Sequence, residues 1–210
     1  MKKLFFNLAL VVILFIPSSC SDDDDNDFKP TSSTVDIFDL TFTKVLGKST
    51  LERNENNIKV AYKTSDLTPG YVYTIWWVIW NKPENCTVPG ACSDADFAIA
   101  DMVEVEVLAG TGIKADASGT ATFIATLNEN DITGSYNAPF GLPAAGGLQD
   151  AQLAEVHIVL RSHGPAIAGQ INAQLTTYEG GCTTFFDPFT EVPDAEGECG
   201  DIQAAIHQPK

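Results

Sequence analysis

Residues 155–166 read EVHIVLRSHGPA and bring together several side chains that could do chemistry. On a β-strand successive side chains point to opposite faces, so Val156, Ile158 and Leu160 would face a core. The opposite face then carries a mixed set: Glu155, His157, Val159, Arg161 and His163. A carboxylate, two imidazoles and a guanidinium on one strand face predict a polar binding site.

Imidazole is a common ligand of zinc and copper, and the three histidines of the chain are His157, His163 and His207. One hypothesis is therefore a Cu or Zn site that uses these histidines, in which His157 and His163 bind the ion and Glu155 or His207 is a further ligand. Six residues of straight strand separate His157 from His163 by about 20 Å, so a shared ion requires the chain to turn back near the Gly-Pro pair at 164–165.

The alternative to a metal site is a buried polar network that fixes the strand against a loop. A covered Arg161 needs a planar anionic partner. Glu104 and Glu106, on the polar face of another predicted strand, are candidates for that partner. Buried polar groups are more often structural than catalytic, which favours the network.

Residues 71–80 read YVYTIWWVIW, without a charge. A run that is apolar on both faces predicts a central strand that is covered on both sides. Trp80 lies at its end, beside polar residues, and is the aromatic ring expected to be exposed. An exposed indole stacks on sugars, so glycan binding through Trp80 is a further hypothesis.

Enzyme signatures are absent from the sequence. It contains no Gly-x-Ser-x-Gly elbow, no His-Glu-x-x-His helix and no phosphate-binding loop. The sequence favours a non-enzymatic module that binds a ligand or partner, with the metal-binding and glycan-binding protein as alternatives.

Positioning these residues requires a β-rich scaffold. Seven short β-rich runs separated by Gly, Pro, Asn and Asp turns predict an all-β fold, a single β-sandwich domain over residues 35–210. The runs are residues 35–46, 58–63, 71–80, 102–108, 120–127, 155–161 and 171–178. Short helical turns are expected at a capping box over residues 93–96, and at 149–154 or 201–206.

Four cysteines lie in this domain: Cys86, Cys92, Cys182 and Cys199. We predict the local disulfides Cys86–Cys92 and Cys182–Cys199, each closing a Pro/Gly-rich loop. A zinc site made from all four thiolates is the rival. The spacings C-x5-C and C-x16-C do not match the usual zinc knuckles, so disulfides are favoured.

The N-terminus has the features of an export signal. Lys2 and Lys3 precede an apolar run over residues 4–16, then Pro-Ser-Ser and Cys20. The run is too short to span a bilayer as a helix. Residues 1–19 resemble a bacterial lipoprotein signal, with Pro17 where the usual motif has Leu, and this resemblance implies acylation of Cys20.

An acidic run follows at residues 21–25, SDDDD. It resembles the tag that marks lipoproteins of the Bacteroidota for export to the outer leaflet. We expect a lipidated tether over residues 20–34 that holds the domain on the outer membrane, exposed at the surface, with a periplasm-facing anchor as the alternative. A plain cleaved signal followed by a solvated acidic spacer remains the other interpretation.

The formal net charge is −16. Such a chain repels phosphate backbones, so nucleic acid is excluded as a partner. The expected partners are the membrane, through the Cys20 lipid anchor, and a small ligand, a glycan or a surface protein.

The body of the chain also carries three fairly specific motifs: WWVIWNKPENC at 76–86, residues 154–166, and CGDIQAAIH at 199–207. Together they resemble an uncharacterised family of secreted bacterial β-rich proteins. This resemblance implies secretion and a β-rich fold, and it implies no activity.

Overall fold

The computed structural model describes residues 28–185 and 195–210. Its strands are β1 (Thr31–Asp39), β2 (Val45–Arg53), β3 (Asn57–Thr64), β4 (Tyr71–Trp80), β5 (Val105–Lys114), β6 (Ala121–Asn128), β7 (Glu155–Pro165), β8 (Thr184–Phe185) and β9 (Glu198–His207). The helical turns are η1 (Pro83–Asn85), η2 (Asp94–Ile99), α1 (Ala100–Val103) and α2 (Ile171–Thr176). The predicted signal, Cys20 and the acidic run lie outside the described residues. Within the described ranges, no helix is long and apolar enough to cross a membrane.

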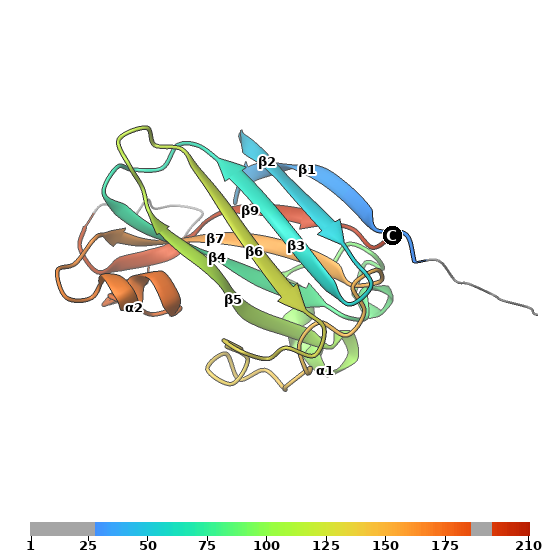
Figure 1. The fold of residues 1–210 in the computed structure, drawn as a ribbon. Helices are drawn as coiled ribbons and strands as arrows, with labels where there is room; N and C mark the ends of the chain where they lie inside the picture. The colour runs from blue at the N-terminus through green and yellow to red at the C-terminus, as the bar shows by residue number, and fades with distance from the viewer. Residues whose placement is uncertain (1–27, 186–194) are drawn as a thin grey trace, which may run out of the picture.

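The strands form one sheet in the order β5-β4-β7-β9-β1-β2-β3-β6, with all of these neighbours antiparallel and β8 added in parallel to β9. The sheet curls until its two edge strands, β5 and β6, contact each other, so that it nearly closes into a barrel (Figure 1). No ladder pairing joins these two edges within the described ranges.

The all-β prediction is confirmed, but the division into two separate sheets of a sandwich is wrong. A short ladder between β1 and β9 joins the two halves, pairing Phe38 with Ala204 and Asp39 with Gln203. It follows a bulge at Ile37/Phe38, where β1 leaves its register with β2. Alternating sequence patterns are the same in a sandwich and a barrel, so they do not reveal this junction.

Three local expectations are corrected. Residues 31–34, assigned to the tether, begin β1, where the hydroxyls of Thr34 and Thr50 pair across the ladder at 2.9 Å. Residues 171–176 form α2 rather than a strand, and the Gln174 side chain fixes this turn by donating to the His163 and Pro165 carbonyls at the end of β7 and accepting the Ile167 N–H. Residues 201–206 belong to β9 rather than to a helical turn.

The interior of the barrel is filled by alternate residues of each strand. Tyr73, Ile75, Trp77 and Ile79 of β4 all lie in one buried cluster with Val156, Ile158 and Leu160 of β7. The predicted inward face of β7 is therefore confirmed. So is the coverage of β4 on both sides, because Trp76 and Trp80 point outward and are buried as well.

Both predicted disulfides, Cys86–Cys92 and Cys182–Cys199, are present. The rival prediction of a four-thiolate zinc site is wrong, because all four sulfurs are consumed in these bonds. The capping box at residues 93–96 is also confirmed. Ser93 and Asp96 bond reciprocally at the start of η2.

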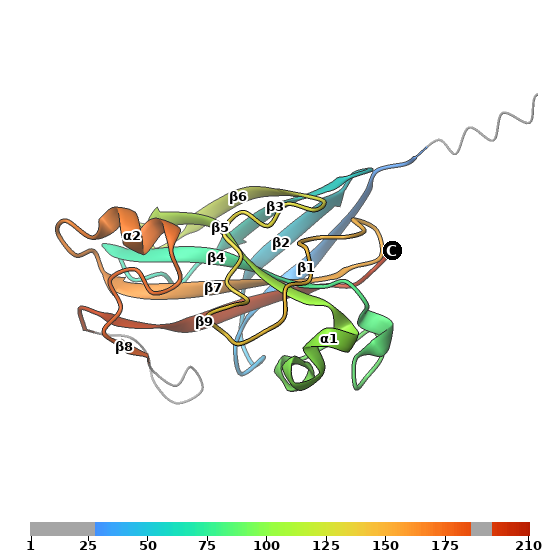
Figure 2. The same ribbon diagram turned by 90° about the horizontal axis from the view of Figure 1, so that it is seen from below.

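The helical turns occupy opposite ends of the outer face of β4 and β7. Figure 2 shows α1 near one end of these strands and α2 near the other. At one end of the molecule, both termini of the described chain meet the same residue, since Thr31 Oγ1 and the backbone N–H of Lys210 both donate to Gln152.

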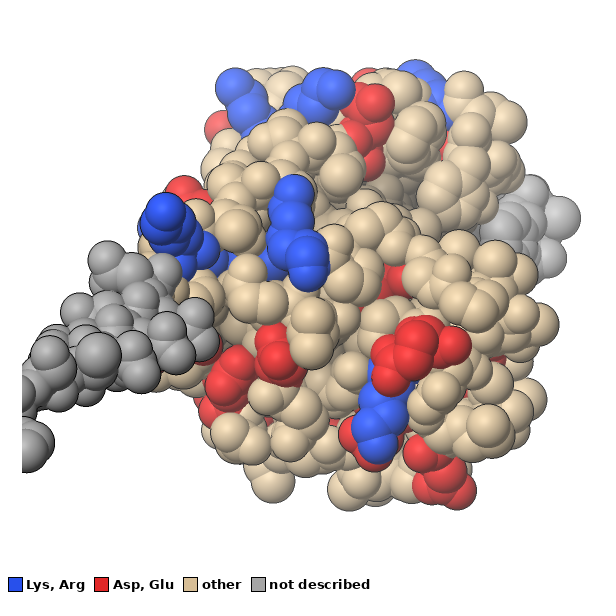
Figure 3. Space-filling view, turned by 90° about the vertical axis from the view of Figure 1, so that its right-hand side faces the viewer, with Lys and Arg blue, Asp and Glu red and all other residues tan. Residues whose placement is uncertain are grey.

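Charged side chains are dispersed on the face shown in Figure 3, where Lys and Arg alternate with Asp and Glu on a largely uncharged surface. Several oppositely charged side chains pair, including Lys82 with Glu104 and Lys48 with Asp36. The acidic excess therefore does not gather into a single patch on this face.

The packing of β4 predicts a large stability difference between two substitutions. Trp77 is 1% exposed, so Trp77→Ala removes a large buried side chain and should cost about 3 to 5 kcal/mol of unfolding free energy. Ile124→Ala, at a side chain 60% exposed on β6, should change it by less than about 0.5 kcal/mol. Urea unfolding of both variants measures the difference, and equal losses would contradict this assignment of the core.

Candidate functional site

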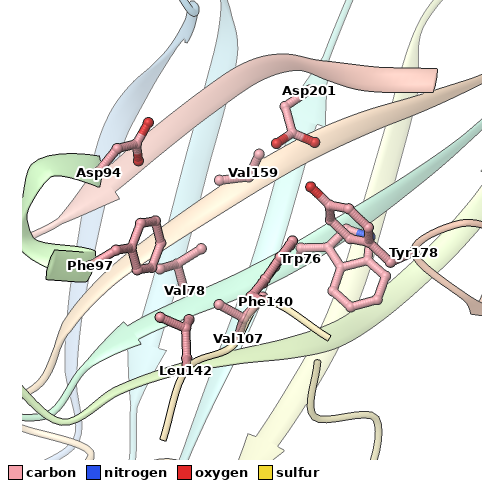
Figure 4. Close-up of a pocket in the computed structure, with 10 residues that line it drawn as sticks. All are labelled: Trp76, Val78, Asp94, Phe97, Val107, Phe140, Leu142, Val159, Tyr178 and Asp201. Carbon is pink, nitrogen blue, oxygen red and sulfur yellow. The ribbon is translucent and has the colours of Figure 1, made fainter. Parts of the chain in front are cut away.

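A pocket of about 340 Å³ opens on the outer face of the half-sheet formed by β5, β4, β7 and β9. We call it the aromatic pocket. It is lined by Trp76, Val78, Asp94, Phe97, Val107, Phe140, Leu142, Val159, Tyr178 and Asp201 (Figure 4). Its volume falls within the range of about 300 to 1,000 Å³ that is usual for small-molecule sites.

The pocket lies where the cover over the sheet is incomplete. Trp80 at one end of β4 packs against Phe97, and Trp76 near the middle of the strand packs against Tyr178. Between these two covered positions, Val78 of β4 and Val159 of β7 are only half-buried. They form an apolar floor, together with Val107 of β5.

The first wall comes from η2, which carries Asp94 and Phe97. The Cys86–Cys92 disulfide closes the loop before it, and Asp96 accepts the backbone N–H groups of Thr87 and Ser93. Glu155 of β7 fixes this loop to the sheet by accepting the Cys92 N–H at 3.0 Å. Glu155 is fully buried, so the bond is shielded from water.

The second wall comes from the loop between β6 and β7, which carries Phe140 and Leu142. Residues 134–136 of this loop bond to the free edge of β5. Buried Glu106 of β5 accepts the backbone N–H groups of Ala145 and Gly147, and it also binds the hydroxyl of Ser135. Asn137 receives the Val107 N–H and donates to two carbonyls, one from β5 and one from the loop.

The third wall is Tyr178, in the loop after α2. Arg161 of β7 donates through Nε to the Tyr178 carbonyl (3.0 Å) and through Nη1 to Asp201 Oδ1 (2.8 Å). The expected anionic partner of Arg161 is therefore Asp201, and neither Glu104 nor Glu106 takes that place. Glu104 pairs with Lys82, and Glu106 holds the second wall.

The ring of Tyr178 lies at the centre of an aromatic cluster. The Arg161 guanidinium carbon is 3.8 Å from its centroid, and Tyr136 stacks on it at 4.8 Å. Trp76 and Phe140 meet it edge-on at 5.0 Å each. Ring pairs in these geometries, and a cation over a ring, add stability beyond the burial of area, so these contacts hold the Tyr178 ring in place.

Two carboxylates stand on the same side of the aromatic pocket, Asp94 at the η2 end and Asp201 on β9 (Figure 4). Burial raises the pKa of Asp201, although the Arg161 cation opposes the shift, and the charge of Asp94 raises the pKa further. The hydroxyl of Tyr178 also bonds the Asp201 side chain. Asp94 is exposed and has no partner among the described residues.

His157 and His163 share the outward face of β7 with Glu155, Val159 and Arg161, as predicted. His157 Nε2 bonds Glu155 Oε1 at 2.7 Å, and its ring packs against Trp80. At the other end of the strand, His163 Nδ1–H donates to the Gly180 carbonyl (3.0 Å) and Nε2 accepts from the Thr74 hydroxyl (2.8 Å). His157 thus bonds a residue of its own strand, whereas His163 links β7 to β4 and to the loop after α2.

His207 lies apart from the other two histidines. It neighbours Val156 across the β7–β9 ladder, on the inward face, and bonds Ser33 and Ser49 at 2.9 Å each. The structure therefore does not bring His157, His163 and His207 to one point.

Within the described ranges, one group of side chains is arranged so that it could hold a metal ion. It contains His163, Cys182 and Cys199, whose ligand atoms lie within 4.8 Å of one another. Because the two sulfurs form a disulfide, they offer no thiolate to an ion.

The prediction that Trp80 is exposed is wrong. Its side chain is 0% exposed, enclosed by Phe97 on one side and His157 on the other. A buried indole offers no face to a sugar, so the structure removes the basis for glycan stacking at Trp80.

Sequence reasoning missed the residues that make the aromatic pocket. Trp76 was assigned to the core, and Phe97, Phe140 and Tyr178 were not singled out. They come from segments more than 20 residues apart in the chain, and no local pattern links them. The one available signal is that β4 is apolar on its outer face, which requires covering side chains from elsewhere.

No protein-family model matches this chain, and comparisons with curated proteins and with solved structures also find no match. The residues and the geometry alone therefore carry the functional argument.

The two fully buried histidines predict a loss of stability on acidification. Burial lowers the pKa of both His163 and His207 to about 4 from an ordinary 6.5. As the pH falls, the two imidazoles are therefore protonated at a higher pH in the unfolded chain than in the folded protein. The free energy of unfolding decreases as the pH drops from about 6.5 towards 4. Between pH 7 and pH 5 each histidine should account for about 2 kcal/mol of lost stability.

Urea unfolding of the parent and of His207→Gln at both pH values measures this effect. Gln cannot be protonated but can still bond both serines, so this variant should lose about 2 kcal/mol less than the parent on going to pH 5. An equal loss in both proteins would show that His207 does not titrate as a buried neutral group.

Proposed function

We propose that this protein is an extracytoplasmic, lipid-anchored and non-enzymatic module that binds a small ligand in the aromatic pocket. The observation that carries the proposal is the pocket itself, an apolar floor on a rigid sheet with four aromatic residues and two carboxylates around it. A concave, mostly apolar surface with a small number of polar groups pointing into it is typical of ligand sites.

The way the walls are held supports a binding role. Each wall is a loop fixed to the sheet by a buried polar side chain: Glu155, Glu106 or Arg161. Loops that are held by several hydrogen bonds and a disulfide lose little freedom when a ligand arrives, so a preformed site binds with a small entropic cost.

The location forms part of the same proposal. Residues 1–25 support export and acylation at Cys20, and the two disulfides fit an oxidising compartment. The described chain begins beside its own C-terminal residues, at the Gln152 end. A tether would leave the domain there.

Filling the pocket should abolish binding of a neutral apolar probe. Val159→Phe places a larger side chain on the pocket floor, so the saturable fluorescence increase of N-phenyl-naphthylamine seen with the parent should be lost. Ile124→Phe is the matched control, because Ile124 is an exposed aliphatic residue on β6 outside the pocket. It should bind the probe as the parent does.

Circular dichroism and thermal unfolding establish that both variants are folded. A folded Val159→Phe protein that still binds the probe with the parent's affinity would overturn the proposed site. Absence of saturable binding to the parent would do the same.

Anchoring is tested separately. Cys20→Ser removes the only thiol at the end of the signal, so the protein should move from the membrane fraction to the soluble fraction. Mass spectrometry of the parent's N-terminal peptide should show acyl chains on Cys20. The variant Ser19→Ala, which keeps a small residue before Cys20, should remain in the membrane fraction. An unmodified Cys20 in the parent would refute the lipoprotein assignment.

A further inference from the structure

We infer that the ligand of the aromatic pocket is an organic cation, an ammonium group carried on an apolar body. This inference rests on the proposed function and names the class of ligand that the same pocket would take. It follows from the charges, the hydrogen-bonding groups and the shape of the lining.

The charge balance of the pocket favours a cation. Its lining contains two carboxylates, Asp94 and Asp201, and no basic residue. The positive charge of Arg161, whose guanidinium lies over the Tyr178 ring, balances the negative charge of Asp201. Asp94 has no partner of its own within the described ranges, so one negative charge in the lining remains available to a ligand.

The lining side chains offer acceptors but no free donors. Trp76 Nε1 already donates to the Thr74 hydroxyl at 2.9 Å, and the Tyr178 hydroxyl bonds Asp201. The other lining side chains are carboxylates and hydrocarbons. A ligand must therefore bring the donors or the positive charge itself. A sugar, whose hydroxyls need donors as well as acceptors, fits this lining less well.

The apolar floor argues against a metal ion. Calcium and magnesium take six or more oxygen ligands at about 2.0 to 2.6 Å. Here valine side chains separate the two carboxylates, with Val159 between Asp94 and Asp201 in Figure 4. A bulky ammonium can instead place its charge near Asp94 and its apolar body over the valines and Phe140.

The test compares two ligands of the same shape that differ in charge. Para-hydroxyphenyl-trimethylammonium and para-tert-butylphenol are titrated into the parent by calorimetry, each alone and in competition with N-phenyl-naphthylamine. One ion pair near a protein surface corresponds to about a tenfold difference in affinity, so the cation should bind about tenfold more tightly.

Asp94→Asn should remove most of this preference and leave the affinity for the neutral phenol unchanged. Asp101→Asn is the matched control, because Asp101 is an exposed carboxylate on the adjoining α1 that does not line the pocket. It should keep the parent's preference.

The outcomes separate this inference from the proposed function. Equal affinity for the two ligands, or an equal loss in Asp94→Asn and Asp101→Asn, overturns the cation inference while probe binding still supports the pocket as a ligand site. Binding of the cation that persists in folded Val159→Phe places the cation elsewhere and overturns the cation inference, whereas the proposed site is overturned only if probe binding persists in this variant as well. A tenfold preference that is lost in Asp94→Asn and blocked by Val159→Phe supports the inference.

Discussion

Strand β4 is apolar on both faces, and the need to cover its outer face governs much of the structure around it. The barrel interior takes Tyr73, Ile75, Trp77 and Ile79, as in any curled sheet with one buried side. Trp76 and Trp80 lie on the other side, where the sheet offers nothing to bury them. Loops must therefore cross the outside of the sheet, and their backbone groups must find partners there.

Buried polar side chains supply those partners. Glu155, Arg161 and Glu106 each bind backbone groups of a different loop, and His163 binds the Gly180 carbonyl near the Cys182–Cys199 disulfide. The polar face of β7 is thus structural at both ends and apolar at Val159 in the middle. The aromatic pocket lies over this middle position, where the loops held at the two ends do not meet.

The sequence was informative wherever a pattern was local. Alternation on β7, double-sided burial of β4, the capping box before η2 and both disulfides were all predictable. What it did not reveal depends on contacts between distant segments. The junction of β1 with β9 involves only two residue pairs, and Tyr178 meets Trp76 from about 100 positions away. The burial of Trp80 is missed for the same reason, because the capping box predicts the turn that carries Phe97 but does not show that this turn packs on β4.

The short span of the two disulfides has a consequence for protein engineering. They join residues 6 and 17 positions apart, and each therefore constrains mainly the loop that it closes. In the β4–β7 and β7–β9 ladders, by contrast, the paired residues all belong to the strands. The Cys86–Cys92 bond lies just before η2 and the Cys182–Cys199 bond just after Tyr178, and neither contributes a residue pair to these two ladders. A library that varies the segments beside the disulfides can therefore leave the strand register unchanged.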